Sequence, residues 1–318
     1  MLGEGIIGHT GFVGSHLLKQ RSFSNLYNTS NISDIIGHSF DTLICAAAPG
    51  SMFTANRDAE SDLAQIDSLI TTLAKVKARY FILISSIAVL KDFANGDEED
   101  TKAFQQDFAY GRHRRKLELF VEEKFEKSLV VRLPALFGEG LRKNFIFDLL
   151  NPMPSMLTRS KLDGLSNVLD LELFELLNEL YTFDPITGMM KLDRRALEDH
   201  NAHKKLVAEA IEQGFSAMQF HNPETTFQYY NMSKLCSDIE VAIQANISHV
   251  HLATEPVKAS IIHERLTGRA MPDTGARIHR EDMRTAFAKL WGKQGPYLED
   301  SEDVLEQLQL FYEKEKKM

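Results

Sequence analysis

The first 134 residues alternate between continuous apolar runs and longer segments whose apolar positions recur at helical spacing. The helical spacing covers residues 61–77 and 110–127. The apolar runs have the length of buried strands and cover residues 5–7, 41–48, 80–86 and 128–133. This order predicts an α/β fold with a Rossmann-like, doubly wound parallel sheet and right-handed crossovers.

The pattern changes after Asn144, and residues 152–230 are predicted to be mostly helical, most clearly over 171–181 and 204–213. Nearer the start, residues 25–28 can form a second strand and residues 32–40 a short helical connection. The remaining predicted elements are a short strand over residues 249–252 and helices over residues 227–245 and 304–317. The segments after Asn144 define a second region of the chain, and the strand over residues 249–252 is expected to rejoin the sheet.

The first apolar run leads into Gly8-x-x-Gly11-x-x-Gly14 and then into an amphipathic helix. A glycine at the first position permits a tight turn, one at the second lets a pyrophosphate approach the backbone, and one at the third lets the helix pack on the strand. The alternative is a glycine-rich turn that binds nothing. Because a strand precedes the glycines and a helix follows them, we interpret the stretch as a dinucleotide cradle.

Backbone N–H groups at the helix start would hold the pyrophosphate, because the helix dipole favours negative charge there. We expect these groups between Gly11 and Val13, with Thr10, Phe12 and the flanking glycines forming the rest of the cradle. An overlapping glycine pattern that begins at Gly3 is rejected, since no strand leads into it.

Composition narrows the class of protein. The 318 residues include 36 basic and 45 acidic side chains, a net charge of −9, which disfavours nucleic acid as a partner and suits an enzyme with a small-molecule substrate. Two cysteines, Cys45 and Cys236, form neither a disulfide framework nor a metal site, so we expect a reducing compartment, by default the cytoplasm. Without a run of about 18 apolar residues or a basic leader, we expect neither a membrane span nor a signal peptide.

Several polar clusters are interpreted as structural. His200 and His203 lie one turn apart on a predicted helix, but no third ligand is identifiable, so we expect solvent-facing side chains and no metal. His249 and His251 point to one side of their strand as polar residues at the sheet edge. The acidic run over residues 97–100 is interpreted as a solvated loop.

In this order the motifs resemble the extended short-chain dehydrogenase/reductase family, which contains sugar-nucleotide epimerases, dehydratases and reductases. The match covers about the first 150 residues and is thin beyond them. Five pieces carry it: the Gly8-x-x-Gly11-x-x-Gly14 turn, a strand ending Ala46-Ala47-Ala48, a strand ending Ser85-Ser86, Tyr110 at a helix start, and the stretch Val131-Arg132-Leu133-Pro134-Ala135-Leu136-Phe137-Gly138.

The resemblance implies an NAD(P)-dependent oxidoreductase, epimerase or dehydratase that acts on a sugar or sugar-nucleotide-like substrate. Tyr110 would move a proton while hydride passes to or from nicotinamide, with Ser86, rather than Ser85, as the partner hydroxyl. Cofactor contacts would also come from Ala46, Ala47, Ala48, Tyr110 and Pro134. Asn144 stands where family members contact substrate, but a helix N-cap explains it equally well.

The main departure from the family is a missing lysine. The family pattern is Tyr-x-x-x-Lys, whereas here Arg114 lies four residues after Tyr110, on the same helical face. Arginine keeps the charge and can donate to the nicotinamide ribose, but it cannot readily join a proton relay. Catalysis by Tyr110, Ser86 and Arg114 is the first interpretation, and a nucleotide-binding regulatory protein without turnover is the alternative.

A second departure is the short spacing between Gly14 and Asp41, which implies that one βα unit is absent on the adenine side. Asn28 and Ser30, after the second strand, are left to meet the adenosine ribose. Small polar residues accommodate a 2′-phosphate that an acidic side chain would repel, so between NAD and NADP they favour NADP slightly.

These inferences divide the chain into two parts. Residues 1–150 are predicted to form the NAD(P)-binding Rossmann domain, completed by a strand near residues 248–253. Residues 151–318 are predicted to form a smaller, mostly helical region that caps the site and contacts substrate. The expected partner is a small-molecule substrate, with self-association into a homodimer as a further option.

Overall fold

The computed structural model describes residues 2–317, apart from the side chain of Ser166, as two compact units. Unit 1 contains the described residues up to Leu141 together with Thr226–Val257 and Arg280–Phe311. Unit 2 contains Arg142–Thr225, Lys258–His279 and the described residues from Tyr312 onward. Each unit is therefore assembled from separate stretches of sequence.

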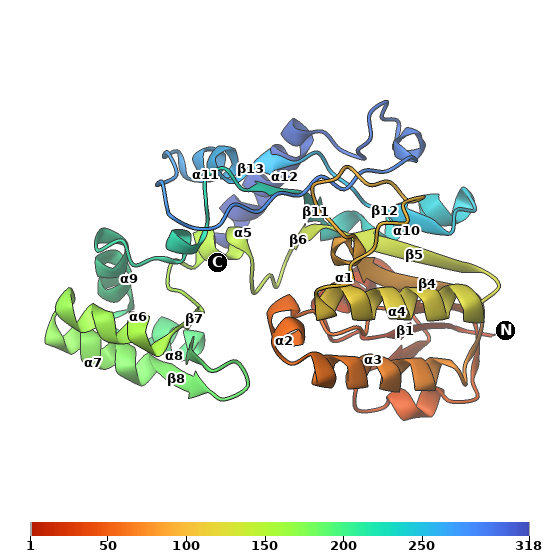
Figure 1. Ribbon diagram of the computed structural model, residues 1–318, viewed down its shortest axis with the longest axis horizontal. Helices are drawn as coiled ribbons and strands as arrows, with labels where there is room; N and C mark the ends of the chain where they lie inside the picture. Colours follow the sequence, from red (N-terminus) through yellow and green to blue (C-terminus); the bar gives the residue numbers. More distant parts are fainter. Residues whose placement is uncertain (1, 318) are drawn as a thin grey trace. The chain divides into compact units, whose positions relative to one another are not determined.

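Unit 1 is built on a sheet of parallel strands (Figure 1). Neighbouring strands follow the order β12-β5-β4-β3-β1-β2, and each neighbouring pair is parallel. The predicted Rossmann-like parallel sheet is confirmed. Its strands in chain order are β1 (Glu4–Ile7), β2 (Asn25–Tyr27), β3 (Ser39–Cys45), β4 (Lys77–Ser86), β5 (Ser128–Leu133) and β12 (His249–His251).

Helices cover both faces of this sheet because its strands are apolar on both sides. Ile6 packs into a core beneath α1 (Phe12–Gln20) and α10 (Leu235–Gln244). Its neighbour Ile7 points the other way, into a second core that includes residues of α3 (Ala59–Leu73) and α4 (Ala109–Lys124). The α3 and α4 helices run side by side on this second face (Figure 1). A short helix, α2 (Met52–Arg57), precedes them and contacts both.

One edge of the sheet is a three-residue strand. Among the described residues, β2 is the edge strand, whereas the usual doubly wound order places one more strand outside it. The chain passes from β2 through a single 3-10 turn, η1 (Ile32–Ile35), to β3, so the helical connection predicted over residues 32–40 is shorter than expected. One βα unit is absent, as the spacing between Gly14 and Asp41 predicted.

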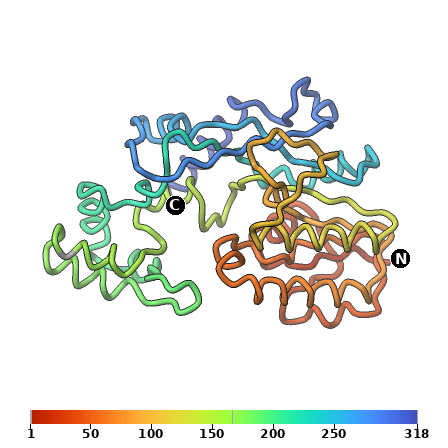
Figure 2. The backbone as a smooth tube through the Cα atoms, in the orientation of Figure 1, coloured from red at the N-terminus to blue at the C-terminus, as the bar shows by residue number. Residues whose placement is uncertain are grey.

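The opposite edge of the sheet is completed from a distant part of the sequence. Val250 of β12 pairs with Val131 of β5, so the cyan part of the chain lies beside the yellow part (Figure 2). The helix predicted over residues 227–245 is wrong in its first part, which forms β10 (Thr226–Phe227), β11 (Tyr229–Asn231) and the 3-10 turn η5 (Met232–Lys234). The strand β11 pairs with β6 (Ala135–Phe137), and its aromatic side chains Tyr229 and Tyr230 are buried there.

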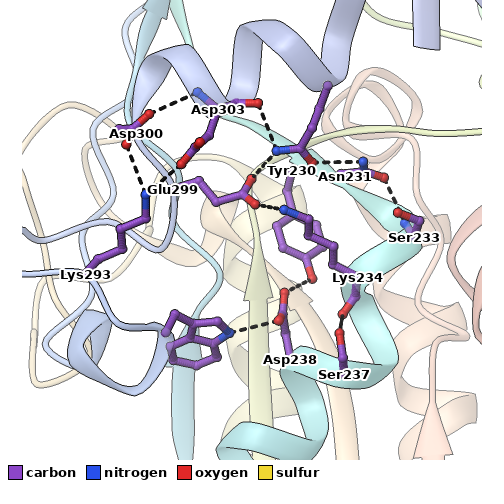
Figure 3. Close-up of polar contacts among 12 residues, drawn as sticks. Tyr230, Asn231, Ser233, Lys234, Ser237, Asp238, Lys293, Glu299, Asp300 and Asp303 are labelled. Carbon is purple, nitrogen blue, oxygen red and sulfur yellow. Dashed lines mark hydrogen bonds and ion pairs between the residues drawn. The ribbon is translucent and has the colours of Figure 1, made fainter. Parts of the chain in front are cut away.

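Polar contacts hold the last stretch of unit 1, which contains η6 (Ala288–Trp291) and most of α12 (Ser301–Glu315), against this returning segment (Figure 3). The Asp238 carboxylate accepts hydrogen bonds from the Tyr230 hydroxyl at 2.6 Å and from the Trp291 indole at 2.8 Å. Lys234 forms an ion pair with Glu299. Because Asp238 is buried, burial raises its pKa, while its two donors oppose the rise.

Unit 2 is mostly helical, as predicted, but it also contains an antiparallel sheet that the sequence pattern did not reveal. Its strands are β7 (Met156–Leu157), β8 (Tyr181–Asp184) and β9 (Met189–Leu192), in the order β7-β9-β8. Tyr181, predicted to end a helix, instead begins β8. The helices are α5 (Phe145–Leu150), α6 (Arg159–Gly164), η3 (Leu165–Asn167), α7 (Leu171–Leu180), α8 (Arg194–Asp199), α9 (His203–Glu212), η4 (Ala217–Phe220) and, after β13 (Val257–Lys258), α11 (Ala259–Thr267).

Within residues 2–317, no helix is both long enough and apolar enough to cross a bilayer.

Candidate functional site

The glycine turn between β1 and α1 is shaped by two very close backbone approaches. Gly8 has a φ of +88°, and a Cβ there would lie 2.5 Å from the Ala46 carbonyl oxygen. A Cβ on Gly14 would lie 2.1 Å from the Gly8 carbonyl oxygen, so α1 can pack on the turn only with glycine at this position. The structure therefore requires glycine at both sites for internal reasons.

Gly11 has a different environment. Its φ of −75° suits any residue, it is exposed, and an added Cβ would meet the protein only at the Gly8 oxygen, 3.4 Å away. The chain itself therefore does not require glycine here, whereas a phosphate lying against the helix start would. Gly11 is also the N-cap of α1 without a side-chain cap, and the first turn, which contains Phe12 and Val13, has no acidic residue. These features fit the predicted pyrophosphate cradle.

The turn after β2, predicted to meet the adenosine ribose, is held by side-chain hydrogen bonds. The Asn28 side-chain oxygen accepts from the Ser30 backbone N–H at 2.9 Å and from its hydroxyl at 2.6 Å. One nitrogen of the His9 ring lies 2.9 Å from the Tyr27 carbonyl, which brings the second residue of the glycine turn to this end of β2. Thr10 is exposed beside it. Among these residues no acid is present to repel a 2′-phosphate.

Ala46, Ala47 and Ala48 continue from the end of β3 past the glycine turn. The Ala46 backbone N–H bonds the Ile7 carbonyl at 2.9 Å, and all three alanines are half-buried. Small side chains at this position leave the carboxyl end of the sheet open to a flat ligand. Pro134, which follows β5, is buried.

Tyr110 and Ser86 are brought together by a glycine that the sequence analysis did not single out. A Cβ on Gly111 would lie 1.9 Å from the Ala88 carbonyl oxygen, so the start of α4 packs directly on the η2 turn (Ile87–Val89) that follows Ser86. The Tyr110 backbone N–H is in turn capped by the Asn56 side-chain oxygen of α2, at 2.9 Å. The hydroxyl and the phenol are thus held by backbone packing.

Burial dominates the ionisation of Tyr110. It raises the pKa of the phenol above 10.0, while the Arg114 charge and the Ser86 hydroxyl act in the opposite direction. The Asp62 carboxylate adds to the rise. The phenol therefore resists ionisation although a cation lies beside it.

Arg114 is held inside the protein by partners from two other segments. Its side chain is 3% exposed, its Nη1 donates to Asp62 at 2.5 Å, and its Nη2 donates to the Pro49 carbonyl. Its guanidinium carbon lies 3.9 Å from the centroid of the Tyr110 ring. Its Nε atom is buried and, within the described part of the chain, has no hydrogen-bond partner. An orphaned donor at this position fits a site that takes a polar ligand.

Asp62 was missed, although its spacing gives a signal. It precedes Ile66 by four residues, which places it on the buried face of α3 with Leu69 and Leu73. An aspartate on such a face needs a buried partner. Its carboxylate accepts from the Arg114 guanidinium and pairs with the His113 ring at 2.8 Å.

A second buried network explains why Ser86 and Ser85 differ. The Ser85 hydroxyl donates to Glu118 at 2.5 Å, and Glu118 also binds Arg132 in a two-pronged pair at 3.0 and 2.8 Å. Despite burial, these donors keep the pKa of Glu118 lowered. Ser85 is therefore engaged in structure, which leaves Ser86 next to Tyr110.

Two polar clusters differ from the sequence interpretation. His251 lies on the edge strand β12 but is fully buried, with its ring between Arg132 at 3.0 Å and the Arg284 carbonyl at 2.7 Å. The acidic run is more than a solvated loop, because the Glu99 carboxylate accepts from the backbone N–H of His251 at 2.8 Å and from the Thr285 hydroxyl at 2.6 Å. Both clusters therefore form hydrogen bonds at the β12 edge of the sheet in unit 1.

The other predicted residues have structural explanations. Asn144 is the N-cap of α5, with its side chain accepting from the N–H groups of Ile146 and Phe147 at 3.0 and 3.2 Å. His200 is exposed, and no group of three metal-binding side chains occurs among residues 2–317. Cys45 and Cys236 are buried free thiols.

Three solved structures illustrate what the chain is similar to, each with a TM-score of 0.60. The dTDP-4-dehydrorhamnose reductase of Bacillus anthracis, in complex with NADP, is 14% identical, and the match covers 99% of both chains. The UDP-N-acetylglucosamine 4-epimerase of Methanobrevibacter ruminantium is 12% identical over 98% of this chain and 97% of that chain. A Tyr-to-Phe variant of the UDP-glucuronic acid 4-epimerase of Bacillus cereus, in complex with NAD, is 12% identical over 99% of both chains.

Neither a protein-family model nor a curated protein sequence matches the chain. The structural similarity nevertheless extends over the full length and identifies the fold. The chain shares the fold of these three structures, which agrees with the Rossmann-like parallel sheet predicted from the sequence.

Proposed function

We propose that the protein is an NAD(P)-dependent oxidoreductase, epimerase or dehydratase that acts on a sugar or sugar-nucleotide-like substrate by hydride transfer. The observation that carries this proposal is the packing of Gly111 on Ala88, which sets Tyr110 beside Ser86 in the unit that holds the glycine turn. A turn that only stabilised the fold would not need a phenol, a hydroxyl and a buried cation together. The proteins with this fold described above include NADP- and NAD-bound enzymes.

We assign the cofactor contacts to the glycine turn and the segments beside it. N–H groups from Gly11 to Val13 would hold the pyrophosphate, and Asn28 and Ser30 would contact the adenosine ribose. Ala46 to Ala48 would line the path between the two halves of the cofactor. Pro134 would lie by the nicotinamide, as the resemblance implies. A nicotinamide ring in this place supplies or accepts the hydride.

Tyr110 is the proposed acid/base. Its hydroxyl would pass a proton to or from the oxygen on the reacting carbon, and Ser86 would hydrogen-bond the same oxygen. Arg114 would stabilise negative charge on the phenol as the proton leaves and use its unpartnered Nε toward the cofactor ribose.

The second candidate function is nucleotide binding without turnover. The observation in its favour is that Arg114 already donates to Asp62 and to the Pro49 carbonyl, which restricts its movement toward a substrate. The glycine turn supports cofactor binding in both cases. The two functions therefore differ only in whether Tyr110 transfers a proton to or from a substrate.

Calorimetric titration with NADPH and NADH tests the shared part of both proposals. Oxidation of NADPH is then measured against a panel of keto-sugars and nucleotide sugars. Turnover with any member supports the enzyme, and cofactor binding without turnover across the panel supports the regulatory protein. Binding of neither cofactor would contradict both.

A further inference from the structure

Asp62 is the acidic residue that faces the proposed acid/base. It is 3% exposed, and one carboxylate oxygen, Oδ2, contacts both the His113 ring at 2.8 Å and Arg114 Nη1 at 2.5 Å. All three side chains are buried between α3 and α4. A buried carboxylate in such a place persists only with partners of this kind.

The Arg114 guanidinium is fixed at two points. Asp62 holds one terminal nitrogen and the Pro49 carbonyl holds the other, which leaves the planar group against the Tyr110 ring. A lysine ammonium could not make the same planar contact with two acceptors while stacking on the ring. Arg114 and Asp62 therefore act together as one unit.

The charges around Tyr110 act in opposite directions. On its own helix Arg114 favours the phenolate, and from the end of β4 Ser86 does the same. From α3, Asp62 opposes ionisation, and burial opposes it most strongly. The His113 ring contacts the same Asp62 oxygen as Arg114. Because Asp62 pairs with Arg114, it offsets part of the charge that favours the phenolate.

We propose that Asp62 is a positioning residue that holds Arg114 on Tyr110 and offsets part of its charge, so that Tyr110 rests as a proton donor and the site reduces a carbonyl group. This inference rests on the proposed function and selects one direction of it. Epimerisation and dehydration by hydride abstraction begin with a base that takes a proton from an alcohol. A phenol that stays protonated at neutral pH suits the opposite step, in which a proton is donated to a carbonyl oxygen.

In that step Tyr110 donates its hydroxyl proton to the carbonyl oxygen as a hydride from reduced nicotinamide reaches the carbonyl carbon. The C=O π bond breaks, one C–H and one O–H bond form, and the substrate becomes an alcohol. The nicotinamide is oxidised by two electrons, and Tyr110 regains a proton from water. The sum consumes one carbonyl, one reduced cofactor and one proton.

The first test needs no cofactor. Ultraviolet titration of the full chain, with Tyr110→Phe subtracted, isolates the ionisation of Tyr110, which we expect above pH 10 in the natural sequence. Asp62→Asn removes the negative charge but keeps an oxygen for Arg114, so the pKa of Tyr110 should fall by about one unit or more. An unchanged or raised pKa in Asp62→Asn, or ionisation of Tyr110 below pH 8 in the natural sequence, would overturn the proposal.

The matched control is Asp67→Asn. Asp67 lies on the same helix and pairs with Lys116 of α4 at 2.5 Å, but both side chains are about half exposed. We expect this variant to leave the Tyr110 titration and any turnover unchanged. A shift equal to that of Asp62→Asn would show that any lost charge between the two helices has the same effect, which contradicts the proposal.

The second test uses turnover with a substrate found in the screen. Reduction should proceed at a steady rate from pH 6 to 9, whereas oxidation of the product should rise with pH. In Asp62→Asn the rise of the oxidation rate with pH should begin at a lower pH, by as many units as the Tyr110 pKa falls. Faster oxidation than reduction at neutral pH in the natural sequence would refute the assigned direction. Failure to bind either cofactor would refute the proposed function, while the first test would still decide the role of Asp62 in Tyr110 ionisation.

Discussion

The Arg114 guanidinium carbon lies 3.9 Å from the centroid of the Tyr110 ring, one helical turn along α4. In the family that the sequence resembles, a lysine stands at the place of Arg114. The replacement is accompanied by a buried aspartate, because a guanidinium has enough donors to serve Asp62, the Pro49 carbonyl and the ring face together. The departure from the family pattern is therefore structurally compensated.

Arg114→Met should raise the pKa of Tyr110 further, because it removes the main influence that favours the phenolate. It should also lower stability by about 3 kcal/mol or more, since the buried Asp62 keeps only His113 as a partner. Ultraviolet titration and urea unfolding measure the two effects. Lys116→Met, which breaks an exposed ion pair on the same helix, should change neither. A Tyr110 titration that stays in place would contradict the electrostatic role of Arg114.

Substitutions in the glycine turn should separate folding from binding. Gly14→Ala places a Cβ 2.1 Å from the Gly8 oxygen, so we expect a large loss of thermal stability. Gly11→Val leaves the internal contacts almost untouched and should abolish NAD(P) binding without unfolding the protein, because the branched side chain occupies the phosphate position. Differential scanning calorimetry and isothermal titration calorimetry measure the two outcomes. Undiminished cofactor affinity in Gly11→Val would refute the cradle.

Tyr110→Phe should reduce turnover by about 100-fold or more while cofactor affinity stays nearly intact, because only the proton donor is lost. Steady-state kinetics and calorimetry on the same preparation measure both. Tyr27→Phe is a matched control, since it also removes one hydroxyl, which bonds His38 at 3.3 Å and has no proposed role in proton transfer. Activity that survives Tyr110→Phe unchanged would rule out the mechanism.

His251 should make stability depend on pH. Burial lowers its pKa from 6.5 to about 4, with the Arg132 charge acting in the same direction. Between these values the unfolded chain binds a proton that the folded protein does not, so the contribution of His251 is complete above about pH 6.5 and is lost as the pH falls toward 4. The loss should reach about 3 kcal/mol.

Urea unfolding at several pH values, compared between the natural sequence and His251→Gln, measures this contribution. The difference between the two curves should change across that range, whereas the exposed His200→Gln should run parallel to the natural sequence. Parallel curves for the natural sequence and His251→Gln would show that the buried His251 ring does not cause the loss of stability at low pH.

Local sequence patterns predicted the elements whose signals lie within one stretch of chain. The apolar run before Gly8 and the spacing to Gly14 determine β1, the turn and the start of α1 without help from the rest of the molecule. The buried strands β4 and β5 are equally clear, because both of their faces are covered and their sequences are almost continuously apolar.

Among the short elements that depend on distant partners, β12 was predicted, whereas β11 and the β7-β9-β8 sheet were not. The three residues of β11 pair with β6, which lies far back in the sequence, and three residues carry no measurable period. The β7-β9-β8 sheet is similarly short. Asp62 and Glu118 show a subtler limit, because a charged residue on an apolar helix face indicates a buried partner but does not identify it.

The assembly of unit 1 from separate stretches also determines when it can fold. The outer partner of β5 is β12, and the segment fastened by Trp291 comes later still, so a nascent chain that has delivered only its first 141 residues lacks both. Until the later stretches leave the ribosome, the edge of β5 remains open and the ring that meets Arg132 is missing. Contacts over such long sequence separations slow folding, and the open edge exposes the early chain to chaperones and to aggregation during synthesis.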